Sequence, residues 1–599
     1  MKRIRALLLA LIMLFALFAG CSKPETGTQS TPTDKPTTTA TAAPTAAPTQ
    51  TAKPEETAEP AGGKVVLPDG TFYNFAAGDY EKDANGIPKA KYEYELPLTN
   101  SDEVLTFWTT CYTPNYITMD YPDSPFPIEL ERQTGVNIEY MIVSSDARAT
   151  NFATLLAADD LPDITTQASS FYPGSFVDAI ENEKYFVNIY DYKDYCPNYI
   201  YEVARNPEDE SLQQTVYLKE NLIPAFYCIR DKTYVQNTLF VRSDWLDRIG
   251  WTRDEIVTWE DTYDLLKAFQ SQIETAVHPT VIFQSLATQH WACFDTFAYI
   301  NPYAMQWHID ENGKAWLAQT TQRDYNVAYE LNRFDREGLF QDDWQTWIDY
   351  NNPNWRAQWL GDSYGYVVLA TSDCSTERQI LDTEDAEWLP IPDPVVTPGQ
   401  TLHVGAALTR TYYGSINVST NCDNIELAMT WLDWRYSDAG ADLMSWGVKG
   451  HAWDYNEDGE REVLKSMYAD SEKNYTMMLL IYCLNTFSEG GLDINEVHYA
   501  FPDGKRVIEA YDYLRGISNN DLAFMVPRGV VLTSDQSSEV QRYSNDIRTF
   551  IAENFLSFVD GSKPLSEWDA YVETLNQIGV PEVLAVYQEA YDDYIARTA

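Results

Sequence analysis

The alternation of apolar and polar positions between residues 239 and 269 predicts a strand followed by two helices. Leu239–Val241 is a short apolar run of the kind that forms buried strands. Ser243 or Asp244 can cap a helix at its N-terminus, and Gly250 can end that helix in the left-handed conformation. The spacing therefore predicts a short helix between these residues, packed beside the strand.

A second helix is predicted directly after this stop. Thr258 and Asp261 resemble a capping box, with Asp in place of the usual Glu or Gln. Helical spacing then places a set of apolar side chains on one face: Tyr263, Leu265, Leu266 and Phe269.

Earlier in the chain, strand and helix patterns alternate. Val104–Trp108 reads as a buried strand, and a helix is expected between Pro127 and Gly135. Strict alternation from Val136 to Ile142 predicts a half-buried strand. Such alternation favours an open, mostly parallel α/β sheet, which binds ligands beyond the carboxyl ends of its strands. The segment Trp108–Tyr116, which follows the first strand, is therefore expected to face a ligand.

Length and charge narrow the classes of protein. A chain of 599 residues is too long for one ordinary core, so two lobes are expected. Its 90 Asp and Glu residues against 42 Lys and Arg residues give a formal net charge of −48. This charge repels phosphate backbones and anionic lipid, which argues against nucleic acid as a partner and against membrane contact beyond a tether. We interpret the acidity as a source of solubility outside the cell.

The cysteines do not predict a disulfide framework. There are eight, and without Cys21 the remaining seven are an odd number with no close pairs. The spacing offers no Cys-x-x-Cys metal site. We expect buried free thiols, with one or two disulfides as the alternative.

The N-terminus has the features of a bacterial lipoprotein signal. Within residues 1–20, basic residues precede the apolar run Ala6–Ala19, which is too short for a comfortable membrane span. The run ends in Phe18–Cys21, which resembles a lipobox, although Leu is preferred at the position of Phe18. This resemblance implies cleavage before Cys21 and attachment of fatty acyl chains to Cys21.

The next two segments differ sharply in composition. Residues 21–63 are mostly Thr, Pro, Ala, Glu and Lys, and are expected to form a disordered tether. Residues 64–100 carry turn signals and aromatic residues, and are expected to wrap the main fold as an N-terminal extension. No later stretch is long and apolar enough to cross a bilayer, so the folded part is expected outside the cell membrane.

A series of motifs supports a resemblance to a known family. The relevant segments are Ala157–Ile164, Leu239–Phe269, Gly361–Leu369, Glu387–Pro394, Tyr413–Glu426, Met444–Gly459 and Phe550–Tyr594. Their order resembles the extracellular solute-binding lipoproteins of ABC importers (family 1), particularly the sugar-binding branch. The resemblance covers roughly residues 100 to 599, and the order of the motifs carries more weight than any one of them.

This resemblance implies a two-lobed α/β fold, the type II periplasmic-binding-protein-like fold. The lobes would be joined by hinge crossings near residues 237, 362 and 415 and would close over a ligand. Residues 101–236 are expected to form lobe 1, and residues 237–361 lobe 2. Residues 362–414 would return to lobe 1, and residues 415–599 would complete lobe 2 with closing helices.

A sugar site requires aromatic planes for the C–H face of the ring and polar side chains for its hydroxyl groups. The 17 tryptophans and 41 tyrosines are an ample supply. By the resemblance, ligand contacts are expected where strands end or lobes meet. The predicted residues are Trp108, Tyr112, Asp163, Tyr172, Trp291, Phe294, Asp373, Arg410 and Tyr412. Alanine at Trp108 and Trp291 is expected to abolish ligand binding and to spare the fold.

Other chemistry finds little support in the sequence. Gly361–Gly365 fits the Gly-x-Ser-x-Gly nucleophile elbow, but a helix-like stretch precedes Ser363 and a strand follows it, the reverse of what the elbow needs. Asp454–Gly459 matches the first half of a calcium loop, but Lys465 stands where the bidentate Glu is due, so a hairpin turn is the preferred interpretation. The six histidines do not pair at metal spacing. No metal, cofactor or catalytic residue is predicted.

The predicted function is therefore capture and not catalysis. We expect a lipid-anchored, monomeric binding component that delivers an extracellular solute, with an oligosaccharide as the first choice, to an ABC permease. The alternatives are a secreted polysaccharide-degrading enzyme and a peptide-binding importer component. The acidic residues are too numerous for any pair to indicate a glycosidase.

Overall fold

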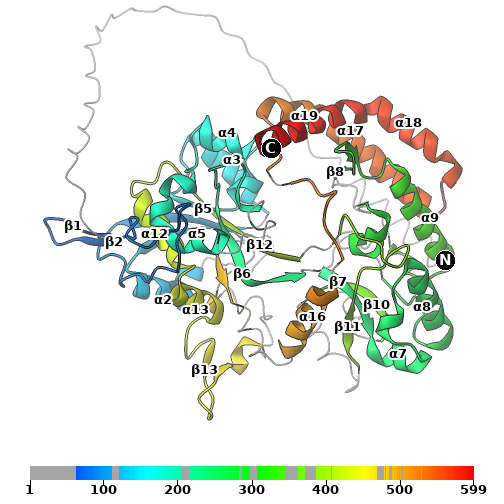
Figure 1. Ribbon diagram of the computed structural model, residues 1–599, viewed down its shortest axis with the longest axis horizontal. Helices are drawn as coiled ribbons and strands as arrows, with labels where there is room; N and C mark the ends of the chain where they lie inside the picture. The colour runs from blue at the N-terminus through cyan, green and yellow to red at the C-terminus, as the bar shows by residue number, and fades with distance from the viewer. Residues whose placement is uncertain are drawn as a thin grey trace, which may run out of the picture. The chain divides into compact units, whose positions relative to one another are not determined.

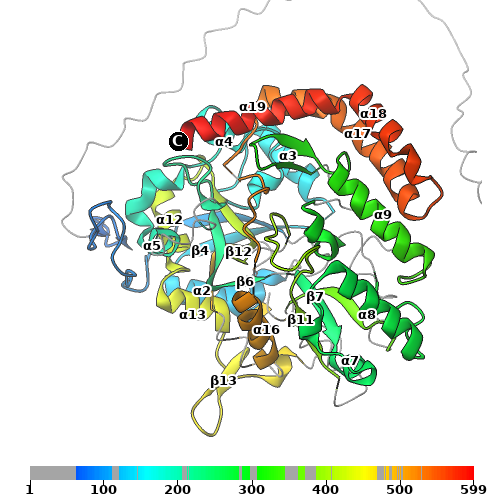
Figure 2. The same ribbon diagram turned by 45° about the vertical axis from the view of Figure 1, so that its right-hand side comes forward.

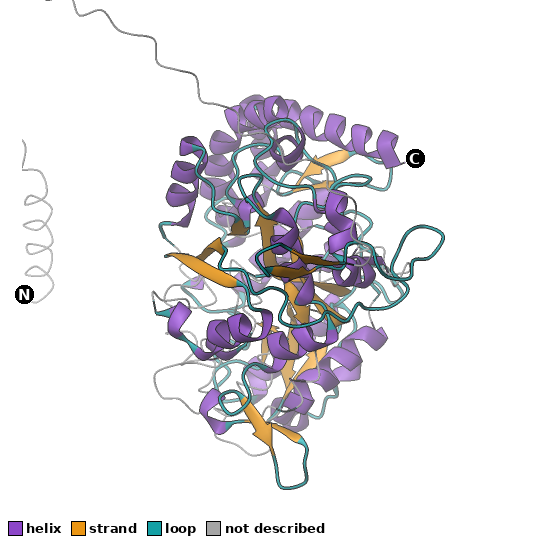
Figure 3. Ribbon diagram, turned by 90° about the vertical axis from the view of Figure 1, so that its left-hand side faces the viewer, coloured by secondary structure: helices purple, strands orange, loops and turns teal. Residues whose placement is uncertain are grey.

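The computed structural model describes most of the chain between Gly63 and Thr598, so the predicted signal peptide and almost all of the predicted tether lie outside the described residues. The described residues are 63–110, 120–144, 146–204, 212, 215–235, 237–281, 287–296, 306–344, 362–371, 386–405, 408–468, 478, 481–483, 489–494, 497, 500, 504–517, 519–527 and 529–598. They form a mixed α/β structure, with strands in the interior and helices around them (Figure 3).

The larger sheet has six strands in the order β15-β6-β12-β5-β3-β4. The strands are β3 (Val104–Thr110), β4 (Asn137–Val143), β5 (Ile164–Thr166), β6 (Phe226–Val235), β12 (Leu408–Val418) and β15 (Gly491–Asp493). β3 is parallel to β4 and β5, and β15 is parallel to β6. β12 is antiparallel to both of its neighbours, β5 and β6. Every strand except β12 therefore runs in the same direction, as the sequence predicts for a mostly parallel sheet.

Helices cover both faces of this sheet. They are α2 (Pro125–Thr134), α3 (Arg148–Ala158), α4 (Phe176–Glu181), α5 (Pro197–Ala204), α12 (Ile425–Trp434) and α13 (Asp438–Trp446). Successive side chains of β3 point to opposite faces. Phe107 packs against Trp431 in the core formed with α2, α5, α12 and α13, whereas Trp108 packs against Phe152 in the core formed with α3 and α4.

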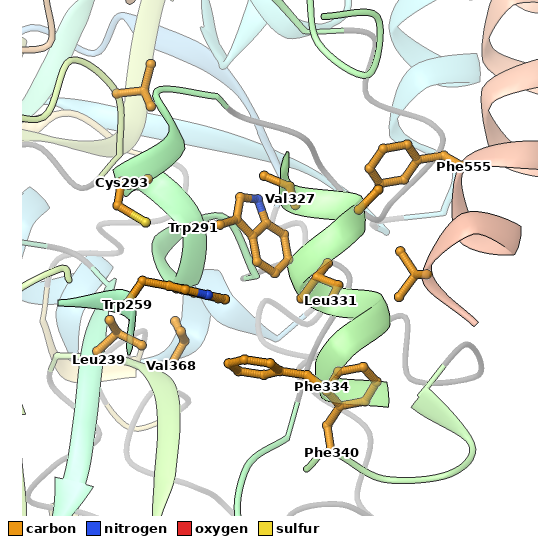
Figure 4. Close-up of a cluster of buried hydrophobic side chains, with 14 of the residues drawn as sticks. Leu239, Trp259, Trp291, Cys293, Val327, Leu331, Phe334, Phe340, Val368 and Phe555 are labelled. Carbon is orange, nitrogen blue, oxygen red and sulfur yellow. The ribbon is translucent and has the colours of Figure 1, made fainter. Parts of the chain in front are cut away.

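The smaller sheet has three antiparallel strands in the order β10-β7-β11. They are β7 (Asn237–Arg242), β10 (Tyr366–Ala370) and β11 (Trp388–Ile391). The helices of this part are α7 (Ser243–Ile249), α8 (Trp259–Gln272), α9 (Gln322–Arg336), α17 (Ser534–Val559), α18 (Trp568–Ile578) and α19 (Val580–Thr598). Figure 4 shows the core that they share with the sheet, in which Leu239 and Val368 lie beside Trp259 and Leu331.

The remaining elements are short or peripheral. The hairpins are β1 (Lys64–Val66) with β2 (Phe72–Asn74), β8 (Trp307–Ile309) with β9 (Ala315–Leu317), and β13 (Trp453–Tyr455) with β14 (Arg461–Val463). One further helix is α16 (Gly504–Ile517). The 3₁₀ helices are η1 (Tyr121–Asp123), η2 (Ala168–Ser170), η3 (Ile189–Tyr195), η4 (Arg253–Glu255), η5 (Ala287–Phe294), η8 (Lys465–Met467) and η9 (Leu565–Glu567).

The stretch from residue 239 to 269 folds as its pattern predicts. Gly250 ends α7 in the left-handed conformation with φ of 75°. The capping box of α8 is present, because Thr258 and Asp261 exchange side-chain and backbone hydrogen bonds. Leu265, Leu266 and Phe269 are buried in the core.

The crossings of the chain between the sheets differ in part from the expectation. β6 ends at Val235 in the larger sheet and β7 begins at Asn237 in the smaller one. The strand expected to return to lobe 1 is β10, but it pairs with β7, as does β11. Among the residues of 362–414 that the structure describes, only those of β12 join the larger sheet. The residues of α12, expected in lobe 2, pack instead on the larger sheet.

Part of residues 64–100 packs into the core beside the larger sheet. Tyr73, Phe75, Tyr94 and Leu98 belong to the core that contains Phe107. None of the helices in the described part of the chain combines the length and apolarity that a membrane span needs.

Candidate functional site

The edge at which the parallel strands end is where an open α/β sheet binds ligands. β3 ends at Thr110, and η1 begins at Tyr121. β6 continues past the level of this edge, because its first residue, Phe226, pairs with Ile416, and Ile416 also pairs with Thr166 at the end of β5. The long strands β6 and β12 therefore run on from this edge toward the smaller sheet (Figures 1 and 2).

A buried ion pair lies against this part of the sheet. Arg435 caps the C-terminus of α12, and Glu489 comes just before β15. Arg435 Nη1 donates to Glu489 Oε2 over 2.9 Å and to the carbonyl oxygen of Gly490 over 3.3 Å. The side chains are only 1% and 2% exposed, so both charges have been taken out of water.

The pair leaves polar atoms without a partner among the described residues. These atoms are Nε and Nη2 of Arg435, Oε1 of Glu489 and Nε1 of Trp431. A buried donor or acceptor without a hydrogen bond costs about 1–3 kcal/mol, and more where the group is charged. Because both side chains of the ion pair are enclosed, these unmet hydrogen bonds lie inside the core of this part of the molecule.

Aromatic rings surround the Arg435 guanidinium. Its Cζ lies 4.2 Å from the centroid of the Trp431 ring and 6.0 Å from that of Phe107. Tyr140 of β4 contacts Phe107, and Tyr121 contacts Tyr140 edge to face at 5.4 Å. We name this group of six residues, Phe107, Tyr121, Tyr140, Trp431, Arg435 and Glu489, the edge cluster.

The electrostatics of the edge cluster follow from burial. Burial raises the pKa of the Tyr121 phenol well above its ordinary value, and the Glu489 carboxylate raises this pKa further. Burial also raises the pKa of Glu489, while Arg435 opposes this rise. The phenol is therefore neutral at physiological pH, and the ion pair has no net charge when Glu489 is ionised.

Helix α16 bridges the two sheets beside the crossing between Val235 and Asn237. On the larger sheet, Arg230 Nη1 donates to the Tyr511 hydroxyl over 3.1 Å, and Arg515 Nη1 donates to the carbonyl oxygen of Thr233 over 2.7 Å. On the smaller sheet, Arg506 forms an ion pair of 2.6 Å with Glu387. Any change in the angle between the two sheets must therefore move α16 relative to one of them.

The residues predicted from the end of β3 and the turn before β5 have structural partners. Trp108 is fully buried, and its Nε1 donates to Asn151 Oδ1 over 2.8 Å. Asp163 Oδ2 accepts from the backbone nitrogen and the hydroxyl of Thr106, each over 2.7 Å. The structure does not bring these side chains into the edge cluster.

Tyr172 and Arg410 are likewise held by other residues. The Tyr172 hydroxyl donates to Glu183 Oε2 over 2.6 Å. Arg410 is 4% exposed, and its Nη2 donates to Glu202 Oε2 over 2.7 Å. This second buried ion pair joins β12 to α5.

The predicted residues of the smaller sheet's part lie in its core. Trp291 is fully buried, and Figure 4 shows its ring among the side chains that fill this core. Phe294 packs against Trp259 edge to face, with the ring centroids 5.4 Å apart. Tyr112 and Asp373 lie outside the described residues, and so does the side chain of Tyr412, whose backbone belongs to β12. The role of all these residues in binding stays a prediction.

The sequence does not predict that Arg435 and Glu489 form a buried ion pair. Arg435 sits among aromatic residues at the end of an apolar helix, where a charged residue is usually a solvated cap. The one sign of an unusual environment in the sequence is that the basic residue stands between Trp434 and Tyr436. Glu489 is one of 90 acidic residues, and only the folded chain singles it out.

The other motifs take structural roles. Residues 453–463 form a β-hairpin, in which Asn456 Oδ1 accepts from the backbone nitrogens of Asp458 and Glu460. This is the hairpin turn preferred over a calcium loop. Within the described residues, no three His, Cys, Asp or Glu side chains are grouped so as to hold a metal ion. The cysteines that the structure describes are free and buried, namely Cys196, Cys228, Cys293, Cys422 and Cys483.

The fold is similar to that of a class of solved proteins. Comparison with solved structures shows the two-lobed α/β fold of solute-binding proteins, among them ABC-transporter-associated ones. No family model matches the chain, and no curated protein matches it by sequence.

Three solved structures illustrate the likeness. An HMO-binding, ABC-transporter-associated solute-binding protein of Bifidobacterium longum infantis superposes with a TM-score of 0.63 at 18% identity, over 82% of this chain and 99% of its own. The alginate-binding protein AlgQ2 gives 0.58 at 18% identity, with the same coverage of 82% and 99%. FusA of S. pneumoniae, solved with kestose, gives 0.57 at 17% identity, over 82% of this chain and all of its own.

Proposed function

We propose that this chain is the solute-binding component of an ABC importer and captures an oligosaccharide outside the cell. The observation that carries the proposal is the fold, which the chain shares over almost the full length of solved sugar-binding proteins of ABC transporters. In this role the protein performs no chemistry. It binds, closes and delivers the solute to a membrane permease, as in other two-lobed binding proteins.

The solute would bind beside the carboxyl ends of the parallel strands β3, β4 and β5, where an open α/β sheet binds ligands. The predicted contacts Tyr112, Asp373 and Tyr412 belong to the proposed site. Trp108 and Trp291 could touch ligand only after leaving the cores in which they are buried.

We place the protein at the outer face of the cell membrane, held by lipid on Cys21, with the tether of residues 21–63 between anchor and fold. The proposal includes a monomer, because capture by two lobes needs no second chain. The signal sequence and the acidic charge of −48 support an extracytoplasmic location.

A thermal-shift screen of the purified protein tests this function. The probes are neutral and acidic oligosaccharides and short peptides, each with the protein's melting temperature as the readout. A ligand that binds only the folded state raises this temperature in proportion to RT ln(1 + [L]/Kd). A rise with one class of sugar, with that sugar recovered intact, supports the proposal. A rise with peptides alone contradicts the sugar assignment, and recovery of cleaved sugar contradicts the binding function.

A further inference from the structure

The chain makes a short excursion between the two parts of the molecule just before helix α17. Phe524 lies in the core shared with the smaller sheet, and so does Val540 of α17. Between them, Val531 packs instead against the core formed with α3 and α4, on the larger sheet. Its neighbour Leu532 already packs against the smaller sheet's core again. We name residues 529–534 the strap, because the chain before and after it belongs to one part of the molecule while the strap itself touches the other.

The strap contacts the larger sheet's part at three places. Val531 makes the apolar contact. Ser534 Oγ donates to Asp178 Oδ2 of α4 over 3.2 Å. Gly529 makes a close backbone contact, since a Cβ atom on it would lie 3.2 Å from the carbonyl oxygen of Leu218. The Leu218 side chain belongs to the core against which Val531 packs, so Gly529 and Val531 are attached to the same core.

This attachment is weaker than the one made by α16. The hydrogen bond from the strap to α4 is exposed to solvent, and Val531 is only half-buried. The larger sheet holds α16 through buried groups instead. The Tyr511 ring contacts the Tyr234 ring edge to face at 5.8 Å, and the Tyr511 hydroxyl accepts from Arg230. Segments with few buried contacts open at a low cost in free energy, so the strap is the bridge that releases first.

The strap rests on a loop at the proposed solute site. Residues 171–175 follow β5 and η2, at the carboxyl end of β5, where open α/β sheets bind ligands. A Cβ atom on Gly174 would lie 3.3 Å from Ser534 Oγ and 3.1 Å from Cε1 of Tyr172. Tyr172 also packs against the same core as Val531. The loop that carries one of the predicted ligand contacts is therefore held directly by the strap.

The two bridges lie on opposite sides of the crossing between the sheets. Figures 1 and 2 show α16 on one side of the point where β6 gives way to β7, and α4 on the other. Two parts that are joined on both sides cannot separate on either side. Because the chain before and after the strap belongs to the smaller sheet's part, separation on the side of α4 requires the strap to release its contacts.

We propose that the strap is a releasable latch, which holds the two parts together on the side of α4 while α16 keeps them joined on the other side. Fastened, it holds residues 171–175 against α17 and closes this side of the proposed solute site. Released, it lets the parts separate and admits the solute to the carboxyl end of β5. The inference rests on the proposed function, because capture by two lobes requires them to open and close.

Distances between two spin labels in the full chain test this latch. One label is attached at Ile128→Cys in α2 and the other at Tyr329→Cys in α9, because Ile128 is 54% and Tyr329 48% exposed. The native cysteines that the structure describes are buried, and the others are replaced by serine. We expect pulsed electron paramagnetic resonance to show a longer-distance population that about doubles when Val531→Ala is combined with Ser534→Ala.

The matched control combines Val396→Ala with Ser538→Ala, which removes an exposed valine side chain and an exposed serine hydroxyl group outside the strap. We expect wild-type distances in this control. Wild-type distances in the folded latch variant as well would overturn the inference. The measurement uses no solute, so that result would leave the proposed function intact, whereas a failed thermal-shift screen would count against the function alone.

A disulfide across the latch gives a second, independent measurement. In a protein with Gly174→Cys and Ser534→Cys the two sulfur atoms come within reach of each other, because a Cβ atom at residue 174 lies 3.3 Å from Ser534 Oγ. We expect oxidised glutathione to cross-link the folded protein, and an added Val531→Ala substitution to slow this reaction about threefold. Val396→Ala is expected to leave the rate unchanged. A folded protein that does not cross-link, or one whose cross-linking rate Val531→Ala does not change, would overturn the latch.

Discussion

The Tyr94 hydroxyl donates a hydrogen bond of 2.7 Å to Asp433 Oδ2 and so joins the N-terminal extension to helix α12, 339 positions further along the chain. Asp433 is fully buried. It also accepts from the backbone nitrogens of Asn198 and Tyr199, at the start of α5. One carboxylate thus fastens the extension, α5 and α12 to each other.

This carboxylate predicts a dependence of stability on pH. Burial raises the pKa of Asp433 from 3.8 to about 7. Between these two values the folded state keeps a proton that the unfolded state releases, so this group's contribution to stability is present below pH 3.8 and is lost as pH rises through about 7. We expect Asp433→Asn to remove this part of the slope, as measured by urea unfolding at a series of pH values.

The control is Tyr94→Phe, which leaves the buried carboxyl group in place. We expect it to keep the pH dependence and to lower the free energy of unfolding by about 1–3 kcal/mol, because one hydrogen bond to a buried carboxylate is lost. Identical pH profiles for the wild type and Asp433→Asn would contradict the assignment.

The capping box of α8 predicts a modest and local effect. The Thr258 side chain accepts from the backbone nitrogen of Asp261 over 3.1 Å at the first turn of the helix. We expect Thr258→Ala to lower the free energy of unfolding by about 1 kcal/mol, the usual cost of losing an N-cap. Thr258→Ser keeps the hydroxyl group and is expected to stay close to wild type. Equal losses in both variants would show that the methyl group, and not the cap, matters.

Close packing at Gly365 predicts a severe effect of one added methyl group. A Cβ atom at this position would lie 2.1 Å from Cε3 of Trp245, which is fully buried. We expect Gly365→Ala to lower the melting temperature strongly, because both Trp245 and the start of β10 would have to shift. Gly516 in α16 is the matched control, since a Cβ there meets nothing within 4 Å. Gly516→Ala is expected to be neutral or stabilising by about 0.5–1 kcal/mol, and a loss of stability in it would count against this account.

Trp291 is a predicted ligand contact, but its burial changes the effect expected from replacing it. Trp291 is fully buried, with 0% of its surface accessible to solvent. We expect Trp291→Ala to lower the free energy of unfolding by about 3–5 kcal/mol, the cost of truncating a large core side chain. Tyr329, which is 48% exposed, is the control, and its replacement by Ala should change little. A stable Trp291→Ala protein that has lost sugar binding would instead support the original expectation.

Local features of the fold could be predicted because they depend on neighbours in sequence. The alternation in β4, the stop at Gly250 and the box at Thr258 each rest on residues within one or two turns. The sheet to which β10 and β11 belong could not be predicted in this way. Their pairing with β7 brings together residues more than 120 positions apart, and the strands themselves carry no mark of their partner.

The candidate site was harder to predict for a related reason. Trp108 and Arg435 are both buried, but only the fold shows that the Trp108 indole has its hydrogen-bond partner and that Arg435 is paired with Glu489. In a chain with 17 tryptophans and 90 acidic residues, residue type alone does not separate core from site.

The order along the chain of the strands of the larger sheet affects how the protein folds during export. β6 and β12 are neighbours in this sheet, yet the whole smaller sheet lies between them in sequence, and β15 follows only at Gly491–Asp493. If the chain is exported N-terminus first, as the proposed location requires, it cannot complete the sheet until residue 493 has crossed the membrane. Strand pairs between distant segments fold slowly and leave apolar edges open to aggregation. The half-exported chain, with β5 still lacking β12, is therefore the stage that most needs protection by folding factors outside the membrane.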